Sequence, residues 1–208
     1  MCVGSAEIIE NSSSGTKYFA KVKLNLMLSL RVHSDEQGHL SPDAAFIYNI
    51  EQDATYYFIN VAPQYQSFNN GNWKSLEINT RDLAQSFGHD ISVYTGTSGL
   101  LQFPDVNNND QDIYLYNSQY VPAPLYYWKV LHDPTTNTAA AFIGLNNPHA
   151  TAAPTELCSN TCSQMAWVDW EMTDLPGGYM YCCSLEEAAA AFKEIDSLGL
   201  SSSGLIQQ

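Results

Sequence analysis

Positively charged residues are scarce in this chain. Its 208 residues include eight Lys and Arg against 22 Asp and Glu, a formal net charge of −14, and Arg31 and Arg81 are its only arginines. Proteins that bind nucleic acid draw much of their affinity from basic contacts to phosphate and from the counterions those contacts release. An acidic surface repels a polyanion at long range, although added salt screens the repulsion. Composition alone therefore disfavours a strong nucleic-acid binder.

Several sequence signatures of common protein classes are also missing. The chain has no apolar run long enough to cross a membrane, no Walker-type phosphate loop, no Gly-x-Ser-x-Gly motif and no internal repeat. These absences argue against a membrane-spanning helix, a P-loop NTPase and an α/β-hydrolase. The first residues show neither the basic start nor the apolar core of a signal peptide. The length suits one domain, with or without an appended lobe.

Four of the five cysteines form a C-terminal cluster made of Cys158, Cys162 and the adjacent pair Cys182 and Cys183. Two disulfides between these two pairs are the leading interpretation, and they indicate an oxidising compartment; their connectivity stays open. A zinc site is the alternative, although adjacent cysteines suit a tetrahedral site poorly. Cys2 is left over. The disulfides indicate secretion, whereas the first residues show no signal peptide. Because these two signs conflict, we expect the chain to be a fragment of a longer secreted protein.

Apolar periodicity predicts the elements of the first half of the chain. Residues 1–16 are Ser-rich and expected to be loose, whereas residues 22–32 alternate aliphatic and polar side chains as a half-buried strand does. Residues 55–61 are β-branched and aromatic, which predicts another strand. A helix is expected from Asn72, with Asn69 or Asn70 as its N-cap and Gly88 as its stop. Its apolar face would consist of Trp73, Leu76, Leu83 and Phe87.

The second half reads as strands followed by a helix. Residues 91–103 suggest a hairpin and residues 113–116 a further strand. The acidic turn 105–110 could hold calcium, but it lacks the ligand spacing of an EF-hand, so a plain loop is favoured. Ser184 is expected to cap a helix over residues 184–198, and residues 201–208 are expected to form a mobile tail.

Four short motifs stand in order along residues 36–77. The first is Glu36-Gln37-Gly38-His39, and the second is Asn-Val-Ala-Pro-Gln, which begins at Asn60. Asn69 lies nine residues after Asn60, and Glu77 lies eight further on. In this order and register the motifs resemble the DNA/RNA non-specific endonuclease family. Residues 121–148 are similar to the arthropod branch of that family, where they form strands of the central sheet.

The resemblance implies an α+β fold with a central antiparallel sheet, a ββα-metal (His-Me finger) active-site unit and a disulfide-stapled C-terminal lobe. His39 would be the general base that takes a proton from water attacking a phosphodiester of DNA or RNA. Asn69 would hold one Mg²⁺ or Mn²⁺ ion, which retains most of its waters. Glu77 would hold one of these waters, and Asn60 would brace the site.

The chain departs from the family at its first motif, where the family has Asp-Arg. Glu36 is a mild change, but Gln37 cannot reproduce the charged, forked contact of an arginine with phosphate. Lys23 and Arg31, on the polar face of the strand 22–32, either reach the phosphate instead or are simply solvated. Lys129 is either a charge at the sheet edge, which we favour, or a further phosphate contact.

These patterns predict a loose segment over residues 1–16, a nuclease core over 17–150, a disulfide-rich lobe of the same domain over 151–200 and a tail over 201–208. The leading function is a metal-dependent, sugar- and sequence-non-specific endonuclease that is secreted. The alternative is a weakened or inactive homologue that serves as a binding or storage protein, because Gln37 replaces the arginine and the net charge is −14.

Overall fold

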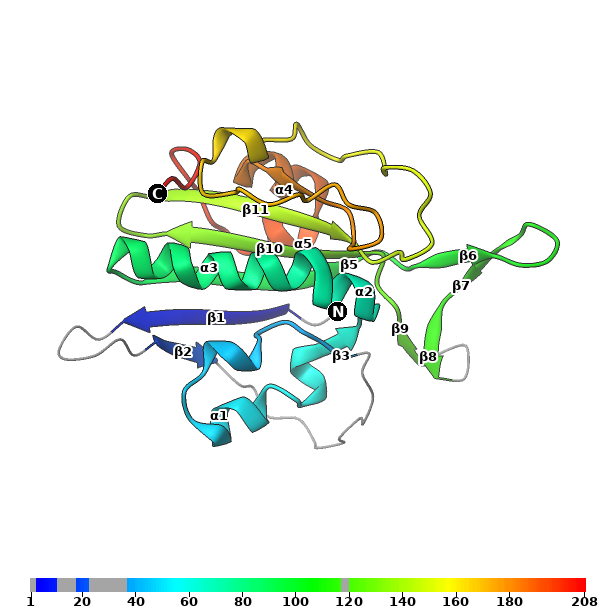
Figure 1. The fold of residues 1–208 in the computed structure, drawn as a ribbon, viewed down its shortest axis with the longest axis horizontal. Helices are drawn as coiled ribbons and strands as arrows, with labels where there is room; N and C mark the ends of the chain where they lie inside the picture. Colours follow the sequence, from blue (N-terminus) through cyan, green and yellow to red (C-terminus); the bar gives the residue numbers. More distant parts are fainter. Residues whose placement is uncertain (1–2, 11–17, 23–36, 117–119) are drawn as a thin grey trace.

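The computed structural model describes residues 3–10, 18–22, 37–116 and 120–208. It shows an α+β fold built on a six-stranded sheet in which every neighbouring pair is antiparallel (Figure 1). In spatial order the strands are β12 (Met180–Cys183), β11 (Thr138–Leu145), β10 (Tyr126–Asp133), β5 (Ile91–Ser98), β1 (Val3–Glu10) and β2 (Tyr18–Val22). The α+β class and the antiparallel sheet are thus as predicted.

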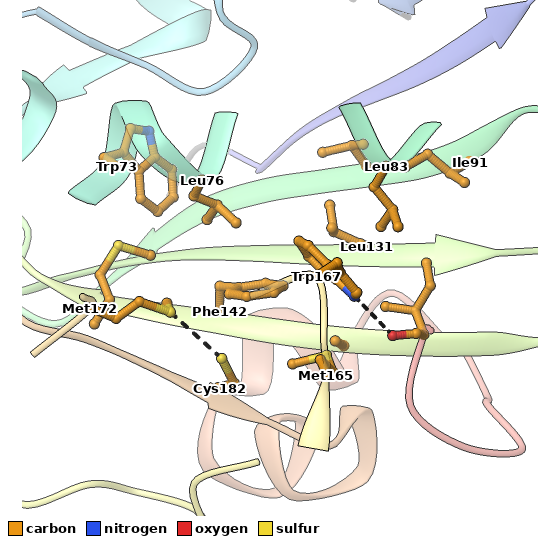
Figure 2. Close-up of a cluster of buried hydrophobic side chains, with 14 of the residues drawn as sticks. Trp73, Leu76, Leu83, Ile91, Leu131, Phe142, Met165, Trp167, Met172 and Cys182 are labelled. Carbon is orange, nitrogen blue, oxygen red and sulfur yellow. Dashed lines mark hydrogen bonds between the residues drawn. The ribbon is translucent and has the colours of Figure 1, made fainter. Parts of the chain in front are cut away.

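The neighbouring strands β10 and β11 are buried on both faces. One face packs against the long helix α3 (Lys74–Phe87). Leu76 and Leu83 of this helix, with Trp73 just before it, share a core with Leu131 and Phe142 of the sheet (Figure 2). The opposite face packs against α4 (Leu185–Ala191) and α5 (Lys193–Asp196). Successive side chains of a strand project to opposite faces, so a strand covered on both sides must be apolar throughout.

The long helix begins earlier than the sequence predicts. A short turn, α2 (Gln66–Phe68), runs through the π-helical segment Asn69–Trp73 into α3, and Asn69 is itself helical, with φ −57° and ψ −46°. The predicted N-cap role of Asn69 or Asn70 is therefore wrong. The chain kinks at Gly71, where the N–H of Asn72 donates to the carbonyl of Gly177 at 2.9 Å. The end of α3 is as predicted, with Gly88 left-handed at φ 65°.

The remaining hairpins lie beside the main sheet. They are β3 (Gln37–His39) with β4 (Val61–Pro63), β6 (Gln102–Pro104) with β7 (Asp110–Asp112), and β8 (Tyr114–Tyr116) with β9 (Tyr120–Pro122). The predicted hairpin over 91–103 is wrong, because β5 pairs with β1 and β10 instead of with β6. The turn 105–110 closes β6–β7, and the Asp105 carboxylate accepts the N–H groups of Asn107 and Asn109.

Residues 40–60 connect β3 to β4 without a strand. They form a 3₁₀ turn at Asp43–Ala45, helix α1 (Asn49–Ala54) and a second 3₁₀ turn at Phe58–Asn60. The strand predicted over residues 55–61 is therefore wrong, and extended structure begins only at its last residue. The β-branched and aromatic composition predicted a buried strand, but several of these side chains, such as Tyr56 and Tyr57, lie on the surface.

Both ends of the chain are more ordered than the sequence suggests. Residues 3–10, expected to be loose, form β1 between β5 and β2. Residues 201–208 are not a free tail, because Ile206 is fully buried and its carbonyl accepts the indole N–H of Trp167 at 3.1 Å (Figure 2). Of the strand predicted over 22–32, only Val22 belongs to the described residues. Cys2, which the C-terminal cysteine cluster leaves over, also lies outside them.

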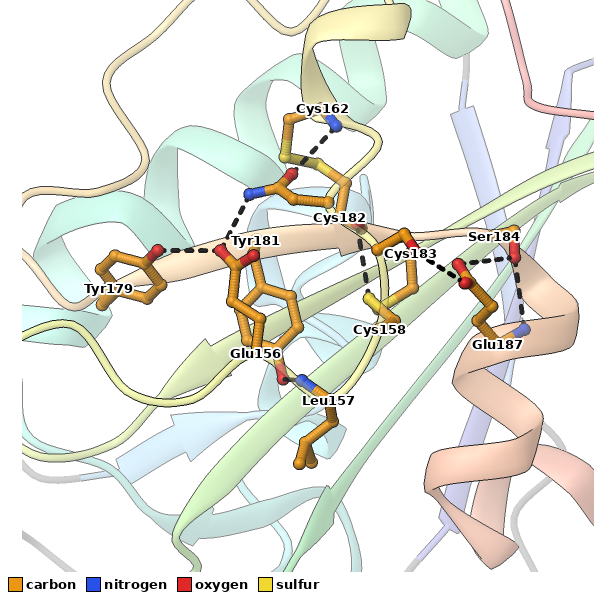
Figure 3. Close-up of a disulfide and its surroundings, with 12 residues drawn as sticks. Glu156, Leu157, Cys158, Cys162, Tyr179, Tyr181, Cys182, Cys183, Ser184 and Glu187 are labelled. Carbon is orange, nitrogen blue, oxygen red and sulfur yellow. Dashed lines mark hydrogen bonds between the residues drawn. A yellow bond between two sulfur atoms is a disulfide. The ribbon is translucent and has the colours of Figure 1, made fainter.

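Two disulfides join the C-terminal cysteine pairs, Cys158 with Cys183 and Cys162 with Cys182 (Figure 3). The zinc alternative is therefore wrong. The adjacent cysteines stand in strand β12, where neighbouring side chains project to opposite faces, so each bridge ties the preceding loop to a different face. Because β12 pairs with β11, the segment 151–200 contributes to the main sheet.

The helix predicted over residues 184–198 is divided into α4 and α5 at Phe192. Its N-cap is as predicted, since the Ser184 hydroxyl accepts the N–H of Glu187 at 3.2 Å. In the part of the chain that the structure describes, no helix is long and apolar enough to cross a membrane.

Candidate active site

The hairpin β3–β4 holds the first two motifs together. His39 pairs with Val61, and the N–H of Leu40 donates to the carbonyl of Asn60 at 2.8 Å. The Asn60 side chain is 7 % exposed; its Oδ1 accepts the N–H of Ser41 at 3.0 Å, and its Nδ2 donates to the carbonyls of Ser41 and Thr55, both at 2.9 Å. Asn60 thus fixes the backbone immediately after His39.

Gly38 of the first motif allows this hairpin to pack on the sheet. A Cβ atom at position 38 would lie 2.5 Å from Gln64 and 2.5 Å from the hydroxyl oxygen of Tyr127. That hydroxyl donates to the carbonyl of Ala62 in β4 at 2.8 Å. Gln64, the last residue of the second motif, is buried against the same glycine. Any larger residue at position 38 would push β3, and with it His39, away from Tyr127.

His39 lies in a half-buried environment. Its ring contacts that of Tyr56 edge to face at 4.6 Å between centroids, and the Tyr56 hydroxyl donates to Asp43 Oδ2 at 3.1 Å. Burial lowers the pKa of His39 below its ordinary 6.5, although the nearby Asp43 carboxylate opposes that change. The imidazole is therefore neutral at pH 7 and able to accept a proton. Its Nε2 is buried and has no hydrogen-bond partner within the described ranges.

Helix α3 faces the loop after His39 across a cavity of about 20 Å³, room for a single water molecule. The cavity is lined by Leu40, Ser41, Pro42 and Ala45 from the loop, by Glu77, Thr80 and Arg81 from the helix, and by Val93, Thr95 and Lys129 from the sheet. Glu77 therefore lies on the same cavity as the backbone that Asn60 fixes. Arg81, one helical turn beyond Glu77, lines it too.

Beneath the cavity, Lys129 is only 1 % exposed in the central strand β10. Its Nζ donates to Thr95 Oγ1 at 2.8 Å and lies 5.0 Å from the centre of the Trp73 ring. The prediction of a sheet-edge charge is wrong, because β10 has β5 on one side and β11 on the other. A direct phosphate contact has no support either, since the ammonium group is not at the surface.

The charges of Glu77 and Lys129 influence each other beside this cavity. Burial raises the pKa of Glu77 to about 7, whereas the charges of Lys129 and Arg81 oppose that rise. Burial also lowers the pKa of Lys129 to about 8, and the charge of Glu77 opposes this change. Each ion thus depends on its neighbour to stay charged near neutral pH.

The other predicted site residues differ in what the structure says of them. Asn69 is half-buried in the turn before α3, and its N–H donates to the carbonyl of Tyr65 at 2.9 Å. Gln37 is described by its backbone, which pairs with Pro63. Lys23, Arg31 and Glu36 lie outside the described residues.

A divalent cation could be held here by only a few protein atoms. Within the described ranges no group of three or more His, Cys, Asp or Glu side chains is placed to bind a metal. A hard oxygen ligand such as the Asn69 carboxamide, with water completing the shell, suits Mg²⁺, which gives up its waters reluctantly. The amide oxygen of Asn69 therefore suits this ion better than zinc or copper, which favour nitrogen and sulfur ligands.

Sequence reasoning missed three residues around the site. Arg81 could have been found, because it follows Glu77 by four residues and so shares its helix face. Tyr56 packs against His39 and donates a hydrogen bond to Asp43. Both residues lie in the connection between β3 and β4, and no sequence pattern predicts how that connection folds.

Comparison with known proteins identifies the family. The sequence profile of the DNA/RNA non-specific endonucleases matches residues 11–188, so the chain belongs to this family. It is 38 % identical over 155 residues to a salivary endonuclease of Lutzomyia longipalpis and 33 % identical over 150 residues to salivary protein Tsal1 of Glossina morsitans morsitans. These matches cover 73 % and 71 % of this chain but only 37 % of each relative.

Among solved structures, that of an EndoG/EndoGI complex aligns with a TM-score of 0.43 and 22 % identity, covering 57 % of this chain and 50 % of that one. The predicted family is confirmed, and its named relatives are salivary proteins of insects.

Proposed function

We propose that this chain carries the active site of a metal-dependent endonuclease that hydrolyses phosphodiester bonds in DNA and RNA. The observation that carries the proposal is the cavity shared by the loop after His39 and the face of α3 that bears Glu77 and Arg81. It supports a ββα-metal arrangement, in which two short strands and a helix present the reacting groups. Membership of the endonuclease family supports the same reaction.

In this proposal His39 acts as the general base. Its lowered pKa keeps the imidazole neutral at physiological pH, so it takes a proton from the water that attacks phosphorus. Asn60 holds the backbone on which His39 stands. One Mg²⁺ or Mn²⁺ ion, held through Asn69, would neutralise the charge that develops on the phosphate and on the leaving oxygen.

Glu77 orients water on the helix side of the site. An ionised carboxylate accepts hydrogen bonds more strongly than a protonated carboxyl, and Lys129 and Arg81 favour the ionised form. Lys129 thus serves as a positioning residue beneath the site, in place of the phosphate contact considered from the sequence. Because such a site contacts the sugar–phosphate backbone more than the base edges, it should cleave DNA and RNA with little sequence preference.

Digestion of plasmid and of RNA tests this proposal. The wild-type protein should nick plasmid in the presence of Mg²⁺, EDTA should abolish the nicking, and His39→Ala should remove it. His132→Ala, which changes a histidine at the far end of β10, is the matched control and should leave the rate unchanged. Activity that survives both EDTA and His39→Ala would contradict the proposal.

A second candidate is a weakened or inactive nuclease homologue that serves as a binding or storage protein. Gln37 in place of the family's arginine and the net charge of −14 favour it. A protein that binds no Mg²⁺ and leaves plasmid intact from about pH 6 to 9 would support this candidate. Both candidates are proposed to be secreted, on the strength of the two disulfides and the salivary relatives.

A further inference from the structure

Three aromatic rings from three separate segments meet at the end of the second motif. Tyr65 follows β4, Phe103 belongs to β6, and His149 follows β11. Their centroids lie 6.3 Å (Tyr65 to Phe103), 6.3 Å (Tyr65 to His149) and 5.2 Å (Phe103 to His149) apart, and each pair meets edge to face. Tyr65 and Phe103 are half-buried and His149 is exposed, so part of this aromatic surface faces solvent.

The ring cluster lies close to the candidate active site. The carbonyl of Tyr65 accepts the N–H of Asn69, so the two residues are about one helical turn apart, with a rise of about 6 Å. Tyr65 also lies two residues beyond Pro63, whose backbone pairs with Gln37 of β3. A nucleic-acid strand held at Asn69 would therefore bring a neighbouring nucleotide to the rings.

The cluster is also held in place before any ligand arrives. Asn146 is fully buried, and its Oδ1 accepts the N–H of Tyr65 at 2.9 Å while its Nδ2 donates to the carbonyls of Pro63 and Pro124 at 3.0 and 2.9 Å. One residue further on, Asn147 Oδ1 accepts the N–H of His149 at 2.9 Å. The same short segment thus fixes the backbone that carries two of the three rings, which lowers the entropy lost on binding.

A concave surface adjoins the rings on the side of the β8–β9 hairpin. Tyr65 lines a cavity of about 100 Å³ together with Pro63, Tyr114 and Asn146. This volume exceeds what a single water needs. The rings and this cavity together offer an aromatic, uncharged surface beside the candidate site.

The acidic charge of the protein favours a binding surface that does not rely on cations. With eight Lys and Arg against 22 Asp and Glu, the chain can obtain little affinity from phosphate contacts. Stacking of bases on aromatic side chains needs no cation and tolerates any sequence. It does need bases whose faces are free, and in a duplex those faces are covered by neighbouring base pairs.

We propose that Tyr65, Phe103 and His149 form a stacking subsite for a base of single-stranded DNA or RNA, next to the active site. This inference rests on the proposed function for its substrate, but it concerns binding and is independent of cleavage. It assigns the enzyme a preference for unpaired strands, loops and ends over intact duplex. It also explains how a protein so acidic can hold nucleic acid with few phosphate contacts.

Binding measured in EDTA tests the subsite without any cleavage. Fluorescence anisotropy with labelled oligothymidylate, a single-stranded RNA and a DNA duplex of equal length should show the tightest binding to the single strands. Tyr65→Leu and Phe103→Leu keep apolar packing but remove the ring, and each should weaken single-strand binding roughly 5- to 100-fold. Duplex binding should change less than about twofold, because duplex bases cannot stack on the rings.

Two controls separate stacking from other effects. Tyr48→Leu, which removes an exposed tyrosine beside α1, should leave binding unchanged, and the thermal midpoints of all variants show whether they fold. An abasic strand keeps the phosphates, so wild type should bind it weakly and the two ring variants no more weakly. Equal loss of single-strand and duplex binding, no loss in either ring variant, or a wild type that binds neither form would each overturn the proposal. Failure of plasmid nicking alone would count only against the proposed function.

Discussion

The side-chain amide of Asn60 forms hydrogen bonds with both backbone groups of Ser41, accepting its N–H at 3.0 Å and donating to its carbonyl at 2.9 Å. Such a pair imitates one rung of a β-ladder, so it extends the β3–β4 hairpin by one step past His39. Only a carboxamide supplies both an acceptor and a donor in this geometry. The asparagine of the second motif is thus explained by backbone bracing alone, without any contact to substrate.

Asn60→Ala should destabilise the protein and slow cleavage. The change leaves the buried polar groups of Ser41 and the carbonyl of Thr55 without partners, at a cost of about 2–4 kcal/mol. For a domain of this size the thermal midpoint should fall by roughly 5–15 °C. Asn79→Ala is the control, because it removes one helix-surface bond and should cost less than about 0.5 kcal/mol. Equal midpoints for the two variants would contradict the bracing role.

The acid limb of the pH–rate profile should contain two titrations. Protonation of Glu77, whose pKa lies at about 7, should start the decline near neutral pH. Protonation of the His39 imidazole, whose pKa burial lowers below 6.5, should deepen the decline at lower pH. Asp43 raises this pKa, so Asp43→Asn should move the acid limb further down while keeping an acceptor for the Tyr56 hydroxyl. Initial rates between about pH 4.5 and 8 would measure the shift, with Asp53→Asn as the control. A shift to higher pH in Asp43→Asn would refute this assignment.

Lys129→Met should move the activity to more alkaline pH. The lysine lowers the pKa of Glu77, which lies at about 7 in its presence, so its removal raises that pKa and leaves Glu77 protonated at neutral pH. A protonated carboxyl accepts water poorly, and the rate at pH 7 should fall about tenfold while much of it returns above pH 8. Lys74→Met removes an exposed lysine of α3, the helix that also bears Glu77, and should leave the pH–rate profile unchanged. An unchanged profile in both variants would show that Glu77 does not depend on Lys129.

The sequence predicts what depends on local periodicity. Tyr127, Lys129 and Leu131 alternate along β10, and this spacing places the lysine on the buried face that meets α3. The favoured interpretation as an edge charge failed because charge was weighed above periodicity. The apolar face of α3, the stop at Gly88 and the pairing of the cysteine pairs followed local rules and hold in the structure.

Contacts between distant residues lie beyond such rules. The kink at Gly71 stands where Asn72 forms hydrogen bonds with the carbonyls of Gly177 and Gly178, more than one hundred residues away in sequence. The position of Ile206, a buried residue near the C-terminus, likewise depends on a distant contact, the hydrogen bond from the indole of Trp167 to its carbonyl. In the candidate site the motif spacing predicts that His39, Asn60 and Glu77 come from one hairpin and one helix. The motif spacing does not predict that Tyr56, Asp43 and Lys129 also belong to the site. The catalytic roles stay predictions.

Reduction of the two disulfides should lower stability without removing the fold's central sheet. Each bridge closes a loop of 25 or 20 residues and should contribute about 2–4 kcal/mol, or roughly 5–15 °C in the thermal midpoint. Cys162→Ser with Cys182→Ser removes the bridge beside Met172, on the face that packs against α3. Cys158→Ser with Cys183→Ser removes the bridge on the opposite face and serves as its counterpart. We expect the first pair to reduce nuclease activity more, because α3 bears Glu77. Equal losses in activity would argue against that link.

Gln37→Arg should raise the rate of cleavage of duplex DNA. Residue 37 stands two positions before His39 in the strand whose backbone pairs with β4. An arginine there restores the forked, charged donor that the family places at this position, and such a donor to a developing phosphate charge is worth up to about a hundredfold in rate. The added charge alone also attracts DNA, so Gln111→Arg, which places the same charge on the exposed strand β7, is the matched control. If both variants accelerate cleavage equally, the gain reflects net charge; if neither does, the loss of the arginine is not what limits this site.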